Sequence, residues 1–350
     1  MPSPGTPFVA QLRTALSSLQ DAAPAAALKQ LAALRLDRLP LPCHGATLER
    51  WRALAAVGAH DLALAKLFEG HTDALAILHE AGADGGPGDA LWATWCAEPP
   101  DARLALSARS DGRLRLDGRK AWCSGARDVS HAVVSCWSPD GAAMLAAVDL
   151  RQAGVTVTGD GWNAVGMAAS GSVDVLFDGV DAQVLGGPGF YVERAGFWHG
   201  GAGVAACWYG AATRLADALR ERVAGRSDPH RLAQLGEAAV ALQGSAALMR
   251  EAAARIDRHP QANAMGDALA VRLSVEASAG VVLAAAGRAL GAGPLCKDAA
   301  LARLYADLPV FLRQSHAERD LEALGRLLSE SDNESDNESD NESGAAPWTL

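Results

Sequence analysis

The 350-residue chain lacks several features that would assign it to a class at once. No run approaches 18 uninterrupted apolar residues, so we expect no membrane-spanning helix. Met1–Gln11 has no basic start followed by an apolar block, so we expect no secretory signal. The cysteines form no CxxC pair, which argues against a zinc site or a disulfide framework. Together these absences predict a cytoplasmic protein with reduced thiols. The cysteines are Cys43, Cys96, Cys123, Cys136, Cys207 and Cys296.

An excess of basic residues is also missing. The chain has 31 basic and 41 acidic side chains, a net charge of −10. Seven of the acids lie in residues 330–350, which hold no Lys or Arg, so the body has 34 acidic residues against 31 basic ones. The acidity therefore belongs mainly to the C-terminal segment. Since no basic patch exists to meet phosphates, we expect no nucleic-acid partner.

Residues 330–350 are repetitive. Ser-Asp-Asn-Glu occurs three times in succession from Ser331, with no apolar side chain to bury. Such a segment cannot offset the entropy of ordering, so we predict a disordered acidic repeat tail over 330–350. A solvated extension and a binding tail both remain open. The exact repeat also suggests a gene whose copy number varies.

The remainder has an ordinary globular composition, 49% hydrophobic and 21% charged. Ala- and Leu-rich segments with apolar residues every three or four positions predict an N-terminal helical domain over 1–88. Alternating apolar residues and repeated Asp-Gly turns predict a central antiparallel, β-barrel-like domain over 89–187. A helical pattern returns after four glycine- and proline-rich residues, which predicts a C-terminal helical bundle over 188–329. The fold class is therefore α+β with several domains.

One motif lies in the central region. Residues 117–126 read Asp-Gly-Arg-Lys-Ala-Trp-Cys-Ser-Gly-Ala. This stretch resembles the Gly-x-Lys-x-Trp-Ile-Thr-Asn-(Gly/Ala) motif of the acyl-CoA dehydrogenase family, which lies on a strand beside the flavin ring. The resemblance implies that Trp122 packs against the flavin and that the Ser124 hydroxyl reaches it. An indole offers an apolar wall, and a hydroxyl can donate to a ring nitrogen. A core tryptophan followed by a turn is the alternative.

Weaker similarity to this family extends from about Gly58 to Gly325. Ala97-Glu98-Pro99 stands where the family has Thr-Glu-Pro, and Val165-Gly166-Met167 resembles its Leu-Gly-x-Arg. Arg288 and Gly291 occupy a Gln-x-x-Gly turn that contacts the cofactor of a neighbouring subunit. The resemblance thus implies FAD as cofactor and a homodimer or homotetramer. An arginine at a helix end before a glycine stop is the alternative for Arg288.

Three family motifs are missing. The chain lacks Ala-Gly-Ser-Asp, and for Arg-x-x-Phe-Gly it offers only Arg226 as a loose match. The Tyr-Glu-Gly that supplies the catalytic base in many members falls near His316, with no carboxylate. One branch of the family places its base just before an arginine that opens a C-terminal helix. By that resemblance Glu193 is the candidate base; an acidic residue at a helix N-terminus is the alternative.

The resemblance implies an FAD-dependent oxidoreductase acting on CH–CH groups. Its reaction would be α,β-dehydrogenation of an acyl-CoA or acyl-carrier thioester, with electrons passed to another flavoprotein. Two alternatives stay open. A flavin oxygenase or oxidase of the same fold needs no α-proton base, which suits the missing Tyr-Glu-Gly. A non-catalytic scaffold suits the missing flavin contacts.

Overall fold

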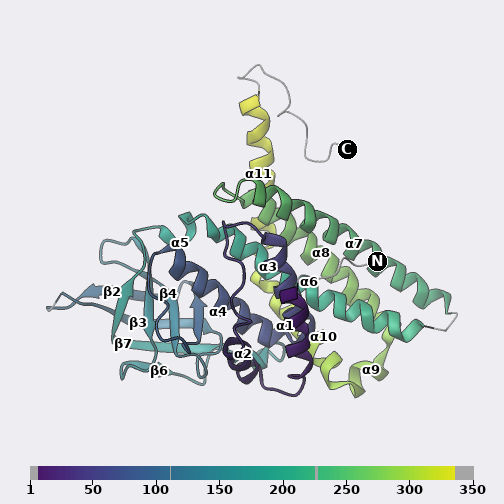
Figure 1. Cartoon of the computed structure of the whole chain (residues 1–350), viewed down its shortest axis with the longest axis horizontal. Coiled ribbons are helices and arrows are strands. Elements are labelled where there is room, and N and C mark those ends of the chain that lie inside the picture. The colour runs from purple at the N-terminus through teal and green to yellow at the C-terminus, as the bar shows by residue number, and fades with distance from the viewer. Residues whose placement is uncertain (1–6, 111, 225–227, 336–350) are drawn as a thin grey trace.

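A computed structural model describes residues 7–110, 112–224 and 228–335. Helices precede and follow a group of strands, and the strands occupy one side of the molecule (Figure 1). The first helices are α1 (Pro7–Ser17), α2 (Pro24–Ala33), α3 (Thr47–His60) and α4 (Leu62–Glu80). The strands are β1 (Trp92–Trp95), β2 (Leu104–Ala108), β3 (Leu114–Cys123), β4 (His131–Trp137), β5 (Ala143–Asp149), β6 (Val155–Val157) and β7 (Val173–Val184). The later helices are α5 (Phe190–Glu193), α6 (Gly196–Val223), α7 (Pro229–Arg258), α8 (Met265–Leu290), α9 (Ala292–Lys297), α10 (Ala299–Phe311) and α11 (Glu318–Ser335).

A proline and a capping aspartate set where two of the N-terminal helices begin. Pro24 is the first residue of α2. Proline lacks a backbone N–H, but the N–H at this position would have no acceptor within the helix. Asp61 has an extended backbone, and its carboxylate accepts from the Leu64 N–H at 2.7 Å. This N-cap separates α3 from α4 inside a segment whose periodicity alone suggests one helix.

Five strands close into a barrel. In the order β4, β2, β3, β7 and β5, each strand pairs with the next, and the β4–β5 pairing closes the ring. β1 and β6 extend the sheet beside β4 and β7. The prediction of an antiparallel domain was wrong for two pairs, because β4 runs parallel to both β1 and β2. The β2–β3 hairpin separates β1 from β4 in the chain, and β3 separates β2 from β4. No tight turn therefore joins either pair and sets its direction.

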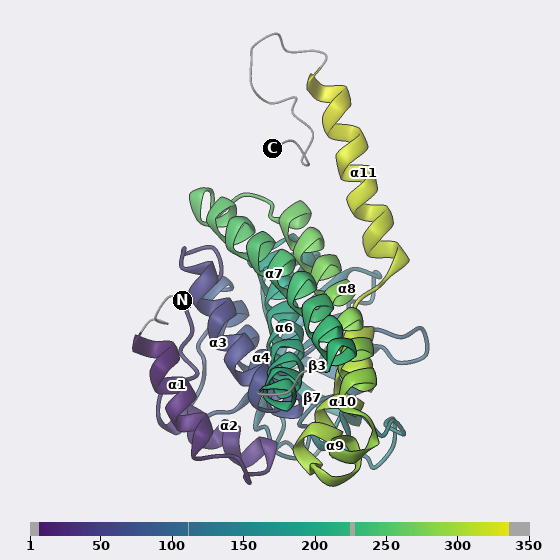
Figure 2. The ribbon, with the colours of Figure 1, turned by 90° about the vertical axis from the view of Figure 1, so that its right-hand side faces the viewer.

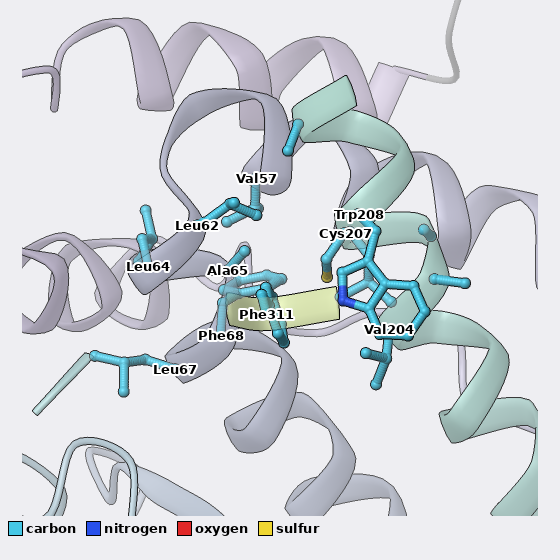
Figure 3. Packing of buried hydrophobic residues seen from close by; sticks show 14 of the residues in the cluster. Val57, Leu62, Leu64, Ala65, Leu67, Phe68, Val204, Cys207, Trp208 and Phe311 are labelled. Atoms are coloured by element: carbon cyan, nitrogen blue, oxygen red, sulfur yellow. The ribbon is translucent and has the colours of Figure 1, made fainter. Parts of the chain in front are cut away.

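The helices before and after the barrel share one hydrophobic core (Figure 3). α3 lies against α6, and a glycine on each helix permits the contact. A methyl group on Gly58 would strike the Cys207 carbonyl, and one on Gly210 would strike the Ala55 carbonyl. The two backbones therefore touch without intervening side chains.

α8 is long and apolar enough, by length and composition, to cross a membrane. Half of its most apolar window is buried inside the structure, where it packs between α6 and α7. A buried core helix passes the same test, so α8 carries no argument for a membrane.

α11 projects away from the helical bundle (Figure 2). It continues to Ser335, so the first Ser-Asp-Asn-Glu repeat has helical backbone, beyond the boundary at 330 that the sequence suggests. The rest of the predicted tail lies outside the described residues.

Candidate functional site

Trp122 stands out at the end of β3. Its φ is +57°, in the left-handed region, and its side chain is 50% exposed, while Ala121 and Cys123 on either side are buried. A register shift between Lys120 and Cys123 in the β3–β7 pairing accompanies this backbone. A bulky residue pays about 1–3 kcal/mol in such a conformation. The exposure excludes a core tryptophan, and the strained backbone presents the indole outwards.

The Ser124 hydroxyl, two residues further on, joins a chain of three buried serines. Ser124 Oγ lies 2.8 Å from Ser172 Oγ, and Ser172 Oγ lies 2.8 Å from Ser170 Oγ. Ser170 donates to the Met167 carbonyl at 2.7 Å. The Ser124 carbonyl accepts from the indole N–H of Trp95 at 3.0 Å. Hydrogen bonds therefore hold both the hydroxyl and the backbone carbonyl of Ser124, two residues from Trp122.

The loop that carries Ser170 and Ser172 is fastened to the helical bundle. Met167, with φ +59°, donates its N–H to the Asp307 carboxylate of α10 at 2.5 Å. A methyl group on Gly166 would strike the Ala306 carbonyl, so only glycine allows this approach. Burial raises the pKa of the Asp307 carboxyl, although the Met167 N–H bond acts in the opposite direction. Barrel and bundle thus meet at the base of the serine chain.

Residues from two of the segments that resemble the family motifs lie close together: Lys120 of residues 117–126 and Glu98 of residues 97–99. Lys120 is fully buried and donates to the Ser135 hydroxyl at 2.6 Å. Glu98 accepts from Ser135 Oγ at 2.7 Å and from the Trp137 indole at 3.0 Å, with Lys120 Nζ 3.6 Å away. This cluster links β3 to β4 and to the segment after β1, and Lys120 lies two residues before Trp122 on β3. Its role is to brace that strand.

Glu193 is the last residue of the short helix α5 and is exposed. No described hydrogen bond or ion pair joins it to Trp122 or Ser124, and its carboxylate folds back over Gly189. The next residue, Arg194, is buried and bonds to Glu80 at 2.5 Å and Asp73 at 3.4 Å. Arg194 therefore docks α5 onto α4.

A buried histidine–carboxylate pair was missed by the sequence analysis. His71 on α4 accepts from the Trp92 N–H at its Nδ1, 3.0 Å away, and its Nε2 lies 3.1 Å from Asp37. The backbone bond places the proton of the neutral ring on Nε2, so His71 donates to Asp37. The run Glu69–Asp73, polar inside an otherwise apolar helix, was the signal that could have revealed it.

Arg288 and Gly291 lie together at the end of α8. Arg288 is exposed and donates to Gln234 at 2.9 Å and to Glu237 at 2.8 Å, both on α7. Gly291 ends the helix with φ +67°. Within the described residues no contact links either to Trp122 or Ser124. Arg226 lies outside the described residues.

The remaining candidates form no metal or nucleophile site. Within the described ranges no cluster of His, Cys, Asp and Glu could hold a metal ion. All six cysteines are free, with four buried, Cys96 half-buried and Cys296 exposed. His199 accepts from the Cys43 N–H at 3.4 Å, and His316 pairs with Asp320 on the surface.

A cavity of about 390 Å³ lies between α4 and the segment before α3, lined by Asp37, Arg50 and Leu75 among others. A second, of about 280 Å³, lies beside Arg214, Leu290 and Asp298. Trp122 and Ser124 line neither of these two cavities, and the Trp122 side chain is half exposed in the single chain.

Comparison with known proteins gives partial sequence matches. No family model matches the chain. A dibenzothiophene monooxygenase from Rhodococcus erythropolis is 33% identical over 182 residues. That match covers 44% of this chain and 43% of the relative, so less than half of the curated relative's length is spanned.

Solved structures match over nearly the whole chain. TdsC from Paenibacillus sp. A11-2, in complex with FMN and indole, has a TM-score of 0.75 at 18% identity and covers 92% of this chain and 97% of its own. KijD3, in complex with FMN and a dTDP-linked amino sugar, has a TM-score of 0.77 at 20% identity, covering 98% of this chain and 96% of its own. The chain therefore has the fold of the acyl-CoA dehydrogenase-like flavin enzymes. The proteins that the chain is similar to thus include a dibenzothiophene monooxygenase and, by fold, FMN-bound TdsC and a nitrososynthase from Micromonospora carbonacea.

The residues present fit a flavin. Trp122 offers an exposed aromatic face held at a strained backbone, and the adjacent Ser124 offers a fixed hydroxyl. A planar ring with polar edges needs such a wall and such a partner. The fit rests on these two neighbouring residues.

Proposed function

We propose that the protein is a flavin-dependent monooxygenase of the acyl-CoA dehydrogenase fold. The observation that carries the proposal is the exposed Trp122 indole, in a left-handed backbone conformation, beside the buried serine chain of Ser124. Backbone strain at a bulky residue is retained where it serves a function. Trp122 would form the wall of the ring site, and Ser124 would hydrogen-bond its edge.

Oxygenation is favoured over dehydrogenation of an acyl thioester. Dehydrogenation needs a carboxylate beside the substrate's α-carbon. Glu193, the candidate base, is exposed and its carboxylate turns back over Gly189, while the carboxylate beside His316, Asp320, is already paired with that histidine and with Arg272. The partial match to a monooxygenase points the same way. Glu193 remains the candidate base for the dehydrogenase reaction, the second candidate function.

We propose FMN rather than FAD as the cofactor. FMN is the flavin in the TdsC and KijD3 complexes. Gripping the second nucleotide of FAD would require Arg288 to leave Gln234 and Glu237, and Arg-x-x-Phe-Gly is missing. When bound, the flavin would activate dioxygen. Trp122 and Ser124 would hold its ring against the barrel.

A homo-oligomer in the cytoplasm remains part of the proposal. Contact of Arg288 and Gly291 with the cofactor of a second copy belongs to the alternative with FAD, because FMN lacks the second nucleotide. The half-exposed Trp122 side chain of the single chain supports the oligomer, because a flavin site needs cover from water. The substrate class is a small apolar or aromatic molecule rather than an acyl-CoA. An electron donor that supplies reduced flavin replaces the electron-accepting flavoprotein.

Isotope labelling separates these functions. The full chain, supplied with FMN, an external flavin reductase and NADH, is incubated with indole or dibenzothiophene under ¹⁸O₂. The proposal expects one ¹⁸O atom in the product by mass spectrometry, and no anaerobic bleaching of bound flavin by acyl-CoAs. Bleaching that is lost in Glu193→Gln would establish the dehydrogenase instead. A protein that takes up neither FMN nor FAD would be the scaffold.

A further inference from the structure

Arg50 is a buried cation that no anion contacts within the described part of the chain. It lies on α3 and is 4% exposed. Among the described contacts its guanidinium makes one hydrogen bond, from Nη1 to the Pro40 carbonyl at 3.1 Å. Its Nε is buried and has no hydrogen-bond partner among the described residues. A guanidinium carries five N–H donors, so most of this hydrogen-bonding capacity is unused.

The carboxylates that act on Arg50 from further away have cations of their own. Burial lowers the pKa of the Arg50 guanidinium, and the charges of Asp73 and Glu69 raise it. However, Asp73 lies 3.4 Å from Arg194, and Glu69 lies 3.0 Å from Lys66. A buried charge without a close partner destabilises a fold, and binding one carbonyl needs only a neutral N–H. A structural role therefore does not account for the charge of Arg50.

Arg50 lines the cavity of about 390 Å³ between α4 and the segment before α3. Much of the wall around it is apolar, since four leucines contribute to the lining: Leu39, Leu41, Leu75 and Leu78. A cavity of this size, with apolar walls and a few polar groups, is suited to a small organic molecule.

The charged groups of the cavity wall leave one positive charge in excess. Asp37 is balanced by Arg38, whose Nε lies 3.5 Å from Asp37 Oδ2. The same oxygen lies 3.1 Å from Nε2 of His71. When His79 is counted as neutral, Arg50 is the remaining charge of the wall. One monoanion would therefore neutralise it.

We propose that this cavity binds a small organic acid, with its carboxylate against Arg50 and its aliphatic or aromatic part against the four leucines. A carboxylate suits a guanidinium because two parallel N–H···O bonds can form between them. The inference goes beyond the proposed function, since it requires no bound flavin and Trp122 does not line this cavity.

The test compares phenylacetate with phenylacetamide, which has nearly the same shape and no charge. Isothermal titration calorimetry of the full chain at pH 8, without flavin, measures both dissociation constants. We expect one equivalent of phenylacetate to bind about tenfold more tightly than the amide, because hydrogen bonds between charged groups are stronger than neutral ones. Equal affinities, or no binding of phenylacetate, would overturn the proposal.

Arg50→Met removes the charge and keeps a side chain of similar length. The preference for phenylacetate over phenylacetamide should fall to about unity. The variant should remain folded, because replacing a buried charge with an apolar side chain is often neutral. Arg52→Met is the matched control, since Arg52 lies on the same helix and does not line the cavity. An unchanged preference in Arg50→Met, or its loss in Arg52→Met, would overturn the role of Arg50.

Leu75→Trp tests the location if Arg50→Met does not fold. Leu75 is half-buried and lines the cavity, so a larger side chain there should occupy part of the space for the ligand. Because Arg50 is retained, any loss of affinity reports on the space and not on the charge. We expect phenylacetate to bind about tenfold more weakly. Unaltered affinity would show that the ligand lies elsewhere.

Acetate and inorganic phosphate test the class of ligand. Both carry the charge but offer little or no apolar surface to the leucines. We therefore expect each to bind the wild type about tenfold more weakly than phenylacetate, or less tightly still. Binding of either ion as tightly as phenylacetate would contradict the assignment to organic acids.

Discussion

At the residue scale, the backbone at Trp122 is less stable than it could be. The left-handed φ of +57° costs stability, and half of the large indole side chain stays exposed. Glycine would adopt this φ without strain. A residue that is costly for folding but aimed outwards indicates that binding, and not packing, accounts for its presence.

We predict that Trp122→Gly abolishes binding with little loss of stability. Relief of strain should offset most of the lost burial of the half-exposed indole, so the free energy of unfolding of the flavin-free protein should fall by about 1 kcal/mol or less, while FMN binding is lost. Chemical denaturation and flavin titration measure the two. Leu176→Gly, at a position 41% exposed on β7 with ordinary φ, is the control and should destabilise more, because no strain is relieved there. A larger loss of stability in Trp122→Gly than in Leu176→Gly would remove the argument from strain.

The thiols give a second prediction at this scale. Burial raises the pKa of Cys43 to about 11 and the pKa of Cys96 and Cys136 to about 12, and it also raises those of Cys123 and Cys207. Only thiolates react readily with Ellman's reagent. At pH 8 the native protein should react quickly at one thiol, Cys296, which is exposed.

Counting thiols checks this directly. Native Cys296→Ser should show no fast reaction, and denatured wild type should show six thiols. Fast labelling of a second thiol in the native wild type would show that the core around these cysteines opens.

At the element scale, α3 and α6 form the closest helix contact that the glycines reveal. Their backbones touch because Gly58 and Gly210 carry no side chain where the partner's carbonyl oxygens lie. Helices packed this closely cannot shift, so α3 fixes the position of α6. Since α4 follows α3 after one capping residue, Asp61, the same contact sets where α4 meets the barrel.

We predict that Gly58→Ala and Gly210→Ala each lower the free energy of unfolding by about 2 kcal/mol or more, since the clash is with backbone that cannot rotate away. Gly236→Ala, on α7 where a methyl would meet nothing within 4 Å, should instead stabilise by about 0.5–1 kcal/mol. Urea denaturation compares the three variants. Similar effects at all three would mean that helix propensity, not contact, governs these sites.

The elements themselves were largely predictable, because each depends on local periodicity. Apolar alternation and Asp-Gly turns indicated most of the strands, and the β2–β3 hairpin pairs antiparallel as the turn requires. The parallel β1–β4 pairing was not predictable, since Trp92 and His131 are 39 positions apart and the whole β2–β3 hairpin lies between them. The Trp122 bulge also depends on its neighbour strand, so the motif indicated the residue but not its backbone.

The site is less predictable than the strands. Trp122 and Ser124 were proposed from a contiguous motif, and they remain a prediction. The Asp307–Met167 bond joins residues 140 apart, and Asp37 meets His71 across 34 positions. Neither pair has a spacing that a pattern could reveal. Ser170 and Ser172 carry no signal in the sequence beyond a polar turn.

At the scale of the whole molecule, buried and half-buried histidines make the free energy of unfolding depend on pH. Burial lowers the pKa of His60, His131 and His199. Below the ordinary value of 6.5 the unfolded chain therefore binds more protons at these residues than the folded chain does. Their contribution to stability is full above pH 6.5 and is lost as pH falls through the lower folded pKa values.

We predict that the free energy of unfolding declines between pH 6.5 and 5, and declines less in His199→Gln. One proton corresponds to a slope of at most about 1.4 kcal/mol per pH unit, which bounds the difference between variant and wild type. Urea denaturation at a series of pH values measures it. His259→Gln, at an exposed position, controls for the substitution. Identical slopes for wild type and His199→Gln would contradict the assignment.

The central claim is that the Trp122 surface binds flavin, and a titration of the full chain with FMN, followed by flavin fluorescence, tests it most directly. The account predicts saturable binding in the wild type and its loss in Trp122→Ala, with an unchanged circular dichroism spectrum. Absence of binding in the wild type, or unaltered binding in a folded Trp122→Ala, would contradict it.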